Sequence, residues 1–563
     1  MIIRFKKKYK INKTNHLVEP DEIFLDSNNQ ENFNRQQFEG RIEKAISKKT
    51  IFSLGAFFTI IIVIFFVRLG YLQIQKGEAY TNRSNNNTLE KQIIFSDRGI
   101  IFDRNNVPLA WNNKDTNNDY AFRSYISPGF SHLLGYVSNP AKDEKGKYWQ
   151  TQFIGKDGLE KQYNDQLNGQ NGEKIIERDV RGQIHTENIV NNPIQGKDLI
   201  TTIDARLQKE LFSVIKNTSD MYSFKGGAGV LMDITNGEII AQTSFPEFSS
   251  EVISQGKDKN TIENYLKDNR KVFLDRTISG LYTPGSIVKP FFALAALSEG
   301  VISPEKKILS SGTLIIPNPY FPDLPSIFKD WKAHGWVDMR GALAVSSDIY
   351  FYEVGGGFED QKGIGILKIK EYAEAFGIGE LTGVDLPDEK KGVIPSPEWK
   401  ALNFKGEPWR VGDTYNTVIG QYGFQLTPLE ITRAISAIAT KGFLPSPHLL
   451  MEVKNDFERI DKDIDENYYK IIHEGMRDGV LYGTSAVLNV PYIEIASKTG
   501  TAQVGLSKSK VNSWITGFFP YQNPKYAFTI MMEEGPSGGT VGAVSVAKNF
   551  FDWISLNAKE YIQ

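Results

Sequence analysis

The longest uninterrupted pattern in the chain is an apolar run near its N-terminus. Residues 50–67, TIFSLGAFFTIIIVIFFV, contain no charged side chain, and a short apolar stretch continues past Arg68. At about 1.5 Å per residue, a helix over 50–72 is long enough to cross about 30 Å of hydrocarbon. A buried core helix fits less well because the run is apolar on every face, and a signal peptide fits less well because no small-residue cleavage site follows. We therefore expect one transmembrane helix at 50–72.

Basic residues are more frequent just before this helix than just after it. Those before it are Arg41, Lys44, Lys48 and Lys49, and those after it are Arg68 and Lys76. The positive-inside rule then places the N-terminus in the cytoplasm and the chain beyond Gly70 outside the membrane. Residues 1–49 open with RFKKKYK and continue in Asn, Gln, Asp and Glu without apolar periodicity, so we expect a flexible cytoplasmic tail.

Short β-rich runs are the main pattern between the apolar run and residue 195. RGIIFDRNNVPLAW at 98–111 places two such runs around a polar turn, which predicts a hairpin. The apolar spacing over 156–168 is helical. A stretch rich in Asn, Gly and Gln then leads to TTIDARLQKEL at 201–211, the start of an amphipathic helix. We expect a small β-rich pedestal over 73–195 and a domain boundary near Gly196.

Residues 196–563 have the pattern of one large α/β unit. Ala228 to Ser244 predicts two strands across Asn236-Gly237, a strong two-residue turn signal. Near the C-terminus, three β-rich runs at 493–502, 513–519 and 526–533 precede a helix that begins near Val544. Apolar helices lie between these two sets of strands. The simplest arrangement is a sheet assembled from both ends of the unit and covered by helices.

The composition excludes several kinds of chemistry. The 563 residues include no cysteine, which excludes disulfides, thiolate zinc sites, iron–sulfur clusters and a cysteine nucleophile. The chain has 65 Lys and Arg against 67 Asp and Glu, a net charge of −2. This balance gives no electrostatic basis for binding nucleic acid, whose phosphates require clustered basic side chains.

A serine one helical turn before a lysine brings a hydroxyl and an amine to the same face, where the amine can take the hydroxyl proton. The pattern Ser-x-x-Lys alone is uninformative, because it begins here at Ser213, Ser254, Ser286, Ser303, Ser326, Ser507 and Ser545. Ser286 differs in its context: Pro284-Gly285 precedes it, and the apolar segment FFALAAL follows Pro290. We expect Ser286 at the start of a buried helix, whose free N–H groups would stabilise an oxyanion.

Two further motifs are candidates for the same site. Ser346-Ser347-Asp348 lies between the apolar segments ALAV and IYFY. Lys498-Thr499-Gly500-Thr501 contains the only Lys-Thr-Gly of the chain and ends a strand-like run. In a strand, Lys498 and Gly500 would lie on one pleat face and the two threonines on the other, and the glycine would let a substrate approach closely.

These three motifs, in this order, resemble the class B penicillin-binding proteins, the monofunctional D,D-transpeptidases of cell-wall synthesis, which share them with serine β-lactamases. The resemblance covers nearly everything after residue 50, including RGIIFDRNNVPLAW, GKDGLEKQY, TTIDARLQ, YTPGSIVKP, WRVGDT, LTPLEI and KTGTAQV. Asp at 348, with HGWVDMRGALAV before it, is more similar to the penicillin-binding protein 2 subgroup of elongation than to the division subgroup. The implied fold is multi-domain α/β: a single transmembrane helix, a dimerisation-like pedestal, and at 196–563 a β-lactamase-like transpeptidase domain whose central antiparallel sheet is flanked by helices.

The resemblance also implies catalytic roles. Ser286 would attack the penultimate D-alanyl carbonyl of a peptidoglycan stem peptide, with Lys289 as general base. Ser346 and Lys498 would relay a proton to the leaving D-alanine, and Asp348 would brace the site. Because burial and a second nearby amine both disfavour a charged lysine, we expect Lys289 to be neutral and Lys498 to be charged in the resting site.

The remaining motif residues would bind the substrate. Thr499 and Thr501 would hold its carboxylate, with Gly500 between them, and the N–H groups of Ser286 and Thr501 would form the oxyanion hole. An amine of a second stem peptide would attack the acyl-enzyme to give a cross-link. A β-lactam would mimic D-alanyl-D-alanine and trap Ser286. The resemblance implies no cofactor and no metal, and it implies a place in the bacterial cytoplasmic membrane.

The chain departs from the family pattern at two points. Little lies between Trp111 and Gly155, so the pedestal is short, and GQYG at 420–423 stands where GQG is usual. The chain holds no segment that resembles a glycosyltransferase. By resemblance, the glycan strands would be polymerised by a partner, a multi-spanning membrane glycosyltransferase.

Several alternatives remain open from the sequence. A D,D-carboxypeptidase or a β-lactamase would use the same serine and admit water as the second nucleophile, and a division-type transpeptidase would share all three motifs. A membrane-anchored scaffold or antibiotic sensor would keep the fold without cross-linking. His334, four residues after Asp330, has a spacing that could ligate a metal on a helix, but without cysteine or a nearby histidine we expect a surface or hydrogen-bonded side chain.

Overall fold

The computed structural model describes residues 47–114, 118–178, 184–318, 321–453, 456–505 and 509–562. The chain divides into two compact units, Met1–Glu90 and Lys91–Gln563. The expected cytoplasmic tail lies outside the described residues up to position 46.

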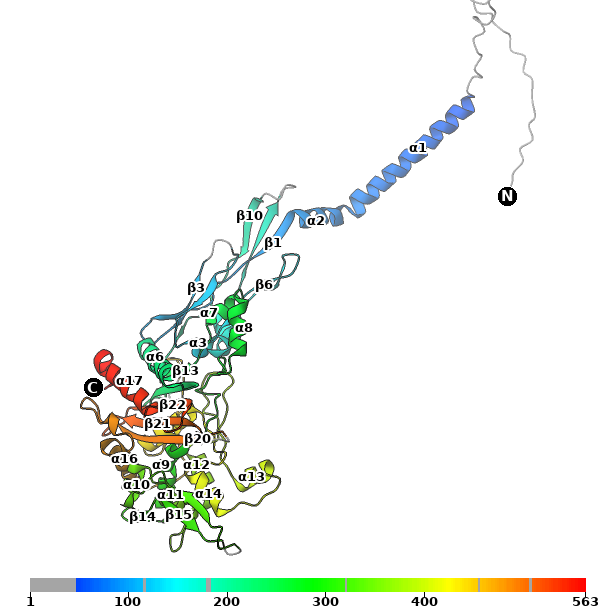
Figure 1. Ribbon diagram of the computed structural model, residues 1–563. Coiled ribbons are helices and arrows are strands. Elements are labelled where there is room, and N and C mark those ends of the chain that lie inside the picture. The colour runs from blue at the N-terminus through cyan, green and yellow to red at the C-terminus, as the bar shows by residue number, and fades with distance from the viewer. Residues whose placement is uncertain are drawn as a thin grey trace, which may run out of the picture. The chain divides into compact units, whose positions relative to one another are not determined.

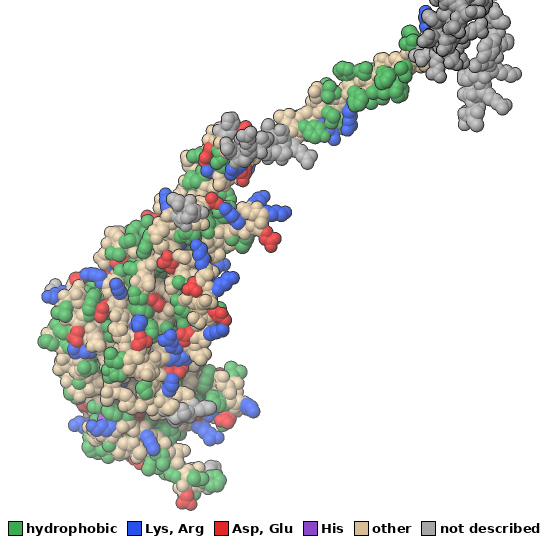
Figure 2. Space-filling view, turned by 45° about the horizontal axis from the view of Figure 1, so that its top comes forward, with side chains coloured by type: hydrophobic (Ala, Val, Ile, Leu, Met, Phe, Trp, Pro, Cys, Tyr) green, Lys and Arg blue, Asp and Glu red, His purple; other side chains and the backbone are tan. Residues whose placement is uncertain are grey.

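Helix α1 (Lys48–Gly70) is the main element of the first unit. Ser47 caps its N-terminus, the π-helical turn η3 (Tyr71–Gln75) continues it, and α2 (Gly77–Thr88) follows. None of the apolar span Lys48–Gln75 is buried by protein, and hydrophobic side chains follow the helix in Figure 2. Helix α1 alone, with 23 residues, reaches about 35 Å, enough for a bilayer core. As expected, this is the one helix in the described part of the chain that is long and apolar enough to cross a membrane.

Small sheets occupy the range expected for the pedestal (Figure 1). A three-stranded sheet has the order β1-β9-β10, a four-stranded sheet has the order β11-β2-β3-β4, and two further strand pairs are β5-β8 and β6-β7. The strands are β1 (Leu89–Ile94), β2 (Ile101–Phe102), β3 (Pro108–Asn113), β4 (Phe122–Tyr125), β5 (Val137–Ser138), β6 (Ala141–Lys142), β7 (Tyr148–Gln150), β8 (Ile154–Gly155), β9 (Gly172–Arg178), β10 (Ile184–Asn191) and β11 (Leu199–Ile200). Strand β11 follows Gly196 in the chain, yet it pairs in parallel with β2.

The hairpin predicted in this region is confirmed, and the predicted helix differs. Strands β2 and β3 form the expected antiparallel hairpin. The helix expected over 156–168 is two short helices, α4 (Gly158–Gln162) and α5 (Asn164–Leu167), because Tyr163 between them has φ −107 and interrupts the helical backbone. A third short helix is α3 (Ser131–Leu134).

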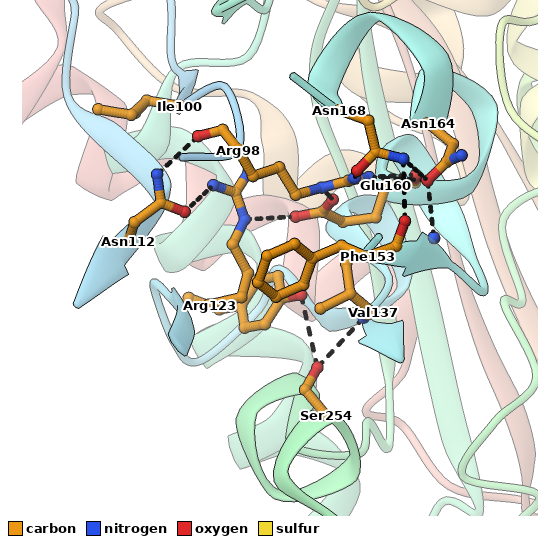
Figure 3. A network of polar contacts seen from close by, with 12 residues as sticks. Arg98, Ile100, Asn112, Arg123, Val137, Phe153, Glu160, Asn164, Asn168 and Ser254 are labelled. Carbon is orange, nitrogen blue, oxygen red and sulfur yellow. Dashed lines mark hydrogen bonds and ion pairs between the residues drawn. The ribbon is translucent and has the colours of Figure 1, made fainter. Parts of the chain in front are cut away.

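A buried cluster of three charges joins the parts of this region (Figure 3). The carboxylate of Glu160 on α4 accepts from Arg98 Nε at 2.6 Å and from Arg123 Nε at 2.7 Å, and all three side chains are fully buried. Asn168 and Asn112 accept further guanidinium hydrogen bonds. Burial acts to raise the pKa of Glu160, but the charges of Arg123 and Arg98 outweigh it and the pKa is lowered. The cluster therefore carries one net positive charge.

A five-stranded antiparallel sheet is the centre of the rest of the chain. Its order is β13-β12-β22-β21-β20, so strands from both ends of the region lie side by side, as expected. The strands are β12 (Gly226–Asp233), β13 (Ile239–Phe245), β20 (Ala496–Val504), β21 (Lys510–Phe519) and β22 (Tyr526–Pro536). Strands β12 and β13 meet at the predicted Asn236-Gly237 turn, where Gly237 has φ +86. Strand β20 is an edge of this sheet.

Helices cover both faces of the sheet (Figure 1). On one face α6 (Ala205–Tyr222) and α17 (Ala543–Asn557) pack against alternate strand residues such as Phe528 and Ile530. On the other face α9 (Lys289–Ser298), α15 (Pro428–Ala439) and α16 (Glu466–Leu481) pack against the intervening residues such as Ala527 and Met531. The two-residue period of β22 thus divides the core into two layers. The predicted α/β class is confirmed.

The remaining elements of this region are shorter. They are α7 (Ser250–Gln255), α8 (Lys259–Lys267), η4 (Gly285–Val288), β14 (Ile308–Ser310), β15 (Thr313–Ile316), β16 (Ser326–Lys329), β17 (Gly335–Val337), α10 (Met339–Val345), α11 (Asp348–Gly356), α12 (Gly365–Ala375), α13 (Pro397–Asn403), α14 (Val411–Val418), β18 (Phe443–Pro445), β19 (Phe457–Arg459), η5 (Ala486–Leu488) and η6 (Lys559–Tyr561).

Candidate active site

Ser286 lies in the 3₁₀ turn η4, directly before the buried helix α9. Gly285 before it has φ +59, and a Cβ there would lie 2.9 Å from the carbonyl oxygen of Thr501 on β20. Glycine is therefore required at 285 both by the backbone angle and by the close approach of strand β20. Ser286 itself is only half-buried, so its hydroxyl is open to a ligand.

Gly500 makes the second close approach between the serine turn and β20. A Cβ at position 500 would lie 2.6 Å from the carbonyl oxygen of Pro284 and 2.9 Å from Ile287 Cγ2. The sequence suggested that this glycine makes room for a substrate, whereas the neighbours that approach it are residues of the serine turn. The edge strand and η4 therefore pack backbone to backbone.

Four predicted site residues form one hydrogen-bonded cluster. The Lys289 amine donates to the Asp348 carboxylate at 2.6 Å and to the backbone carbonyl of Ser346 at 2.8 Å. The Lys498 amine donates to Ser346 Oγ at 2.7 Å, and the Lys289 amine lies 3.4 Å from the same hydroxyl. The Ser346 hydroxyl therefore lies between the two amines, and residues from three distant parts of the sequence meet here, beside the turn that holds Ser286.

The surroundings of the two lysines do not favour the expected charge states. Burial, and then the charge of Lys289, lower the pKa of Lys498 well below its usual value, with Asp348 opposing in part. Lys289 instead forms a close ion pair with the Asp348 carboxylate, which compensates its charge. The ion pair of Lys289 with Asp348 and the lowered pKa of Lys498 both point in the opposite direction to the expected assignment. The sequence did not show that Asp348 pairs with Lys289.

The sequence analysis considered Asp330 only beside His334, but its carboxylate also contacts the segment that carries Asp348. Its carboxylate accepts hydrogen bonds from Ser347 Oγ at 2.9 Å and from the backbone N–H groups of Asp348 and Ile349 at 2.9 and 3.1 Å. Burial acts to raise the pKa of Asp330, but these hydrogen bonds and the charge of Lys289 lower it overall. Asp330 thus holds the N-terminus of α11, and with it Asp348.

His334 was considered as a metal ligand. Its Nε2 lies 3.6 Å from Asp330 Oδ1, and burial lowers its pKa. No group of three or more His, Cys, Asp or Glu side chains suited to a metal ion occurs within the described ranges. The His334 ring also contacts that of Trp331, and its backbone N–H donates to the carbonyl of Ser310 at 2.9 Å.

The loop GQYG packs directly on the serine turn. The Gly285 N–H donates to the carbonyl of Gly420 at 3.0 Å, and Gly420 itself has φ +74. Tyr422 has φ +59, and its ring contacts three other aromatic rings, those of Trp399, Phe404 and Trp409. The tyrosine that interrupts the usual GQG pattern is thus at the centre of an aromatic cluster, two residues after the glycine that contacts Gly285.

The carboxylate-binding candidates lie on the edge strand β20. Thr499 is half-buried and Thr501 is exposed, so both side chains can reach a ligand. The Thr499 hydroxyl lies 2.6 Å from that of Thr484, a residue of the turn after α16 that the sequence reasoning did not identify. No sequence motif marks Thr484, because its importance depends on a contact between distant segments.

Comparison with known proteins places this geometry in a family. The model of the penicillin-binding protein transpeptidase domain matches residues 227–552, and that of the penicillin-binding protein dimerisation domain matches residues 116–201. The peptidoglycan D,D-transpeptidase MrdA of Escherichia coli K12 is 28% identical over 90% of this chain and 94% of its own length.

Two further relatives are similar over most of the chain. The enzyme of the same name from Acinetobacter baumannii is 32% identical over 77% of this chain and 65% of its own length. The penicillin-binding protein 2 from Helicobacter pylori, solved in complex with MreC, is 27% identical, covers 83% of this chain and 99% of its own, and superposes with a TM-score of 0.69.

Proposed function

This chain belongs to the penicillin-binding protein transpeptidase family, with relatives of the penicillin-binding protein 2 type, and we propose that Ser286 is its acylated nucleophile in the cross-linking of peptidoglycan stem peptides. The observation that carries this proposal is the hydrogen-bonded cluster of Lys289, Ser346, Asp348 and Lys498 beside the serine turn. An amine–hydroxyl–amine chain of this kind can take a proton from a nucleophile and return it to a leaving group.

The first half-reaction forms an ester and releases D-alanine. Ser286 Oγ attacks the penultimate D-alanyl carbonyl, a C–O bond forms, and the C–N bond to the terminal D-alanine breaks. The proton of the serine hydroxyl goes to the site amines and from there to the leaving nitrogen. The developing oxyanion is held by the N–H groups of Ser286 and Thr501, a role that the close approach of Gly285 to Thr501 supports.

The arrangement of charges suggests how Lys289 becomes a base. In the proposed resting state Lys289 holds a proton beside the Asp348 carboxylate, so it must lose that proton before it can accept one from Ser286. The Ser346 hydroxyl connects it to neutral Lys498 at 3.4 and 2.7 Å, so a proton can pass from Lys289 to Lys498 through this hydroxyl. A substrate carboxylate bound at Thr499 and Thr501 would raise the pKa of Lys498 and favour that transfer. Substrate binding would then produce the neutral Lys289 that acylation requires.

The second half-reaction transfers the acyl group to an amine. The acceptor stem peptide's amine attacks the ester carbonyl, a C–N bond forms, and the C–O bond to Ser286 breaks as the proton of the amine passes through Lys289 to the serine oxygen. Lys498 then returns the proton it received to Lys289 through the Ser346 hydroxyl, which restores the resting state. Water in place of the amine would give a carboxypeptidase or, with a β-lactam, a β-lactamase.

The proposed function also implies an order of domains and an orientation in the membrane. We place a cytoplasmic tail at 1–49, a transmembrane helix at 50–72, a pedestal at 73–195 and the transpeptidase domain at 196–563, outside the cytoplasmic membrane. The apolar helix α1 and the basic residues before it support this orientation. The pedestal would bind other proteins of the synthesis machinery, and a multi-spanning membrane glycosyltransferase would supply the glycan strands.

The test is mass spectrometry of the full-length protein in detergent after treatment with a penicillin. We expect one covalent adduct on the peptide containing Ser286 and none in Ser286→Ala. Glycan strands with pentapeptide stems are then offered to the enzyme in membranes. Cross-linked stems indicate the transpeptidase, released D-alanine without cross-links a carboxypeptidase, and an adduct without either product a sensor. An unlabelled Ser286 would contradict the proposal.

A further inference from the structure

Thr484 contacts two of the motif-bearing segments although it belongs to neither. Its hydroxyl lies 2.6 Å from the hydroxyl of Thr499 on β20. Its backbone N–H donates to the carbonyl of Ala344 at 3.1 Å, and Ala344 lies in α10, two residues before Ser346. The turn after α16 therefore joins the helix that leads to Ser346 to the strand that carries Lys498.

The position of Thr484 is closely fixed by its neighbours. A Cβ at Gly483 would lie 2.1 Å from the carbonyl oxygen of Ala344, so only glycine allows this approach. Ser497 Oγ donates to Ser485 Oγ at 2.8 Å, and both of these serines are buried. Two hydroxyl pairs thus connect the turn to the strand: a buried pair, and the half-buried pair of Thr484 and Thr499.

The number of protons in the half-buried pair of Thr484 and Thr499 determines which hydroxyl can donate. Each threonine hydroxyl has one proton, and one of the two is used in the bond between them. A carboxylate can only accept hydrogen bonds. If Thr499 binds the carboxylate, its own proton must point to the ligand, and Thr484 must be the donor within the pair.

We propose that Thr484 is a positioning residue that directs the Thr499 proton toward the C-terminal carboxylate of the donor stem peptide. The enzyme thereby selects donors, and β-lactams, that carry a free carboxylate. This inference rests on the proposed function, because it takes the carboxylate site of that function as its starting point. Thr501 contributes to the same site, so the loss of Thr484 weakens the preference for the carboxylate and leaves acylation chemistry intact.

The experiment compares two probes on the full-length protein in detergent: benzylpenicillin and its methyl ester, which has no carboxylate. The second-order rate constant for acylation of Ser286 is measured with each, and their ratio reports carboxylate recognition. We expect Thr484→Val to lower the ratio about tenfold, about 1.4 kcal/mol, with the rate for the ester nearly unchanged. Thr484→Ser, which keeps the hydroxyl, should keep the ratio.

Two controls separate this role from a structural one. Thr440→Val also removes a threonine hydroxyl, one that donates to the backbone carbonyls of Ser436 and Phe443 at the end of α15, and it should leave the ratio unchanged. In a Thr499→Val background, Thr484→Val should have no further effect on the ratio, because the hydroxyl it positions is gone. Thr484→Ala gives a second hydroxyl-free variant in case valine disturbs the turn.

The outcomes distinguish this inference from the proposed function. A wild-type enzyme that neither probe acylates would overturn both. If the wild type is acylated, the proposed function is supported. The inference alone is then overturned if the hydroxyl-free variants keep the wild-type ratio or lose both rates equally. A fall in the rate for benzylpenicillin alone, restored by serine, supports the inference.

Discussion

The amine of Lys498 lies 2.7 Å from the hydroxyl of Ser346, a residue 152 positions earlier in the chain. The same hydroxyl is 3.4 Å from the amine of Lys289. Two lysines therefore share one serine, but only Lys289 has a carboxylate partner, Asp348. In the proposed mechanism, this asymmetry makes Lys289 the amine that holds the proton and Lys498 the amine that accepts it. Two predictions about Lys498 follow.

Lys498→Met should raise the stability of the protein at neutral pH. The pKa of Lys498 is lowered in the folded state, mainly by burial, so the unfolded state binds more protons between that lowered pKa and the free value of about 10.4. The stability of the wild type therefore rises with pH through this window. The loss of stability caused by burying the Lys498 amine is greatest below the window. Thermal unfolding in detergent should give a higher Tm for the variant at pH 7, with a gap that closes toward pH 10.

The control for this experiment is Lys405→Met, at an exposed position. It should leave the Tm nearly unchanged at every pH. A gap between Lys498→Met and wild type that stays constant from pH 6 to pH 10 would show that the amine keeps an ordinary pKa in the folded protein.

Acylation should have an acid limb that depends on Lys498. When the pH falls through its lowered pKa, Lys498 becomes charged and can no longer accept a proton through Ser346. The rate of penicillin acylation should then fall about tenfold per pH unit. In Lys498→Met the remaining slow acylation should lack this limb. Stopped-flow measurement with a fluorescent penicillin checks both profiles, and an identical limb in the two proteins would assign it to another group.

Asp330→Asn should slow acylation and destabilise the protein by about 1–3 kcal/mol. The amide keeps the shape of Asp330 but replaces one oxygen by a donor, which opposes the hydroxyl and N–H groups that now point to it. Ser347 and Asp348 would lose a fixed position, and Lys289 with them. Asp323→Asn, an exposed position between β15 and β16, is the matched control. Equal acylation rates for both variants would mean that Asp330 does not position the site.

The sequence predicted the elements better than the contacts between loops. The turn at Asn236-Gly237 and the apolar helix after Ser286 carry strong local signals, and both form as expected. The convergence of Ser286, Ser346 and Lys498 was implied by resemblance and not by any periodicity. Local patterns identify strands and helices, while the meeting of their ends depends on the packing of the whole core.

The residues that were missed share one property. Asp330 and Thr484 are single polar side chains in connecting segments, and each acts on a motif from a distant part of the chain. No spacing rule distinguishes such a residue from a solvated one. The lowered pKa of Lys498 was missed for the same reason, because it arises from burial and from the charge of Lys289, a residue far away in the sequence.

Gly420→Ala should reduce acylation much more than Gly406→Ala. Both glycines have positive φ, +74 and +82, so each alanine would cost about 1 kcal/mol of backbone strain. A Cβ at 420 would lie 2.2 Å from the carbonyl oxygen of Gly285, whereas a Cβ at 406 meets nothing within 4 Å. Only Gly420→Ala would displace the turn that holds Ser286. We expect at least about a tenfold loss of acylation rate against a near-normal rate for Gly406→Ala, and equal rates would contradict this.

Glu160→Gln should be the most destabilising conservative change in the pedestal. It leaves Arg98 and Arg123 buried without a compensating charge, which costs about 3–5 kcal/mol. Glu173→Gln, which removes the largely exposed pair with Lys91, should cost less than about 1 kcal/mol. Because the pKa of Glu160 is lowered in the folded protein, its contribution is complete above the unfolded value of about 4.3 and is lost as the pH falls through the folded value. Denaturation followed by tryptophan fluorescence measures the free energy of unfolding. The difference between wild type and Glu160→Gln should be constant from pH 6 to pH 8 and smaller below pH 4. A difference no larger than that of Glu173→Gln would show that the buried cluster adds little to stability.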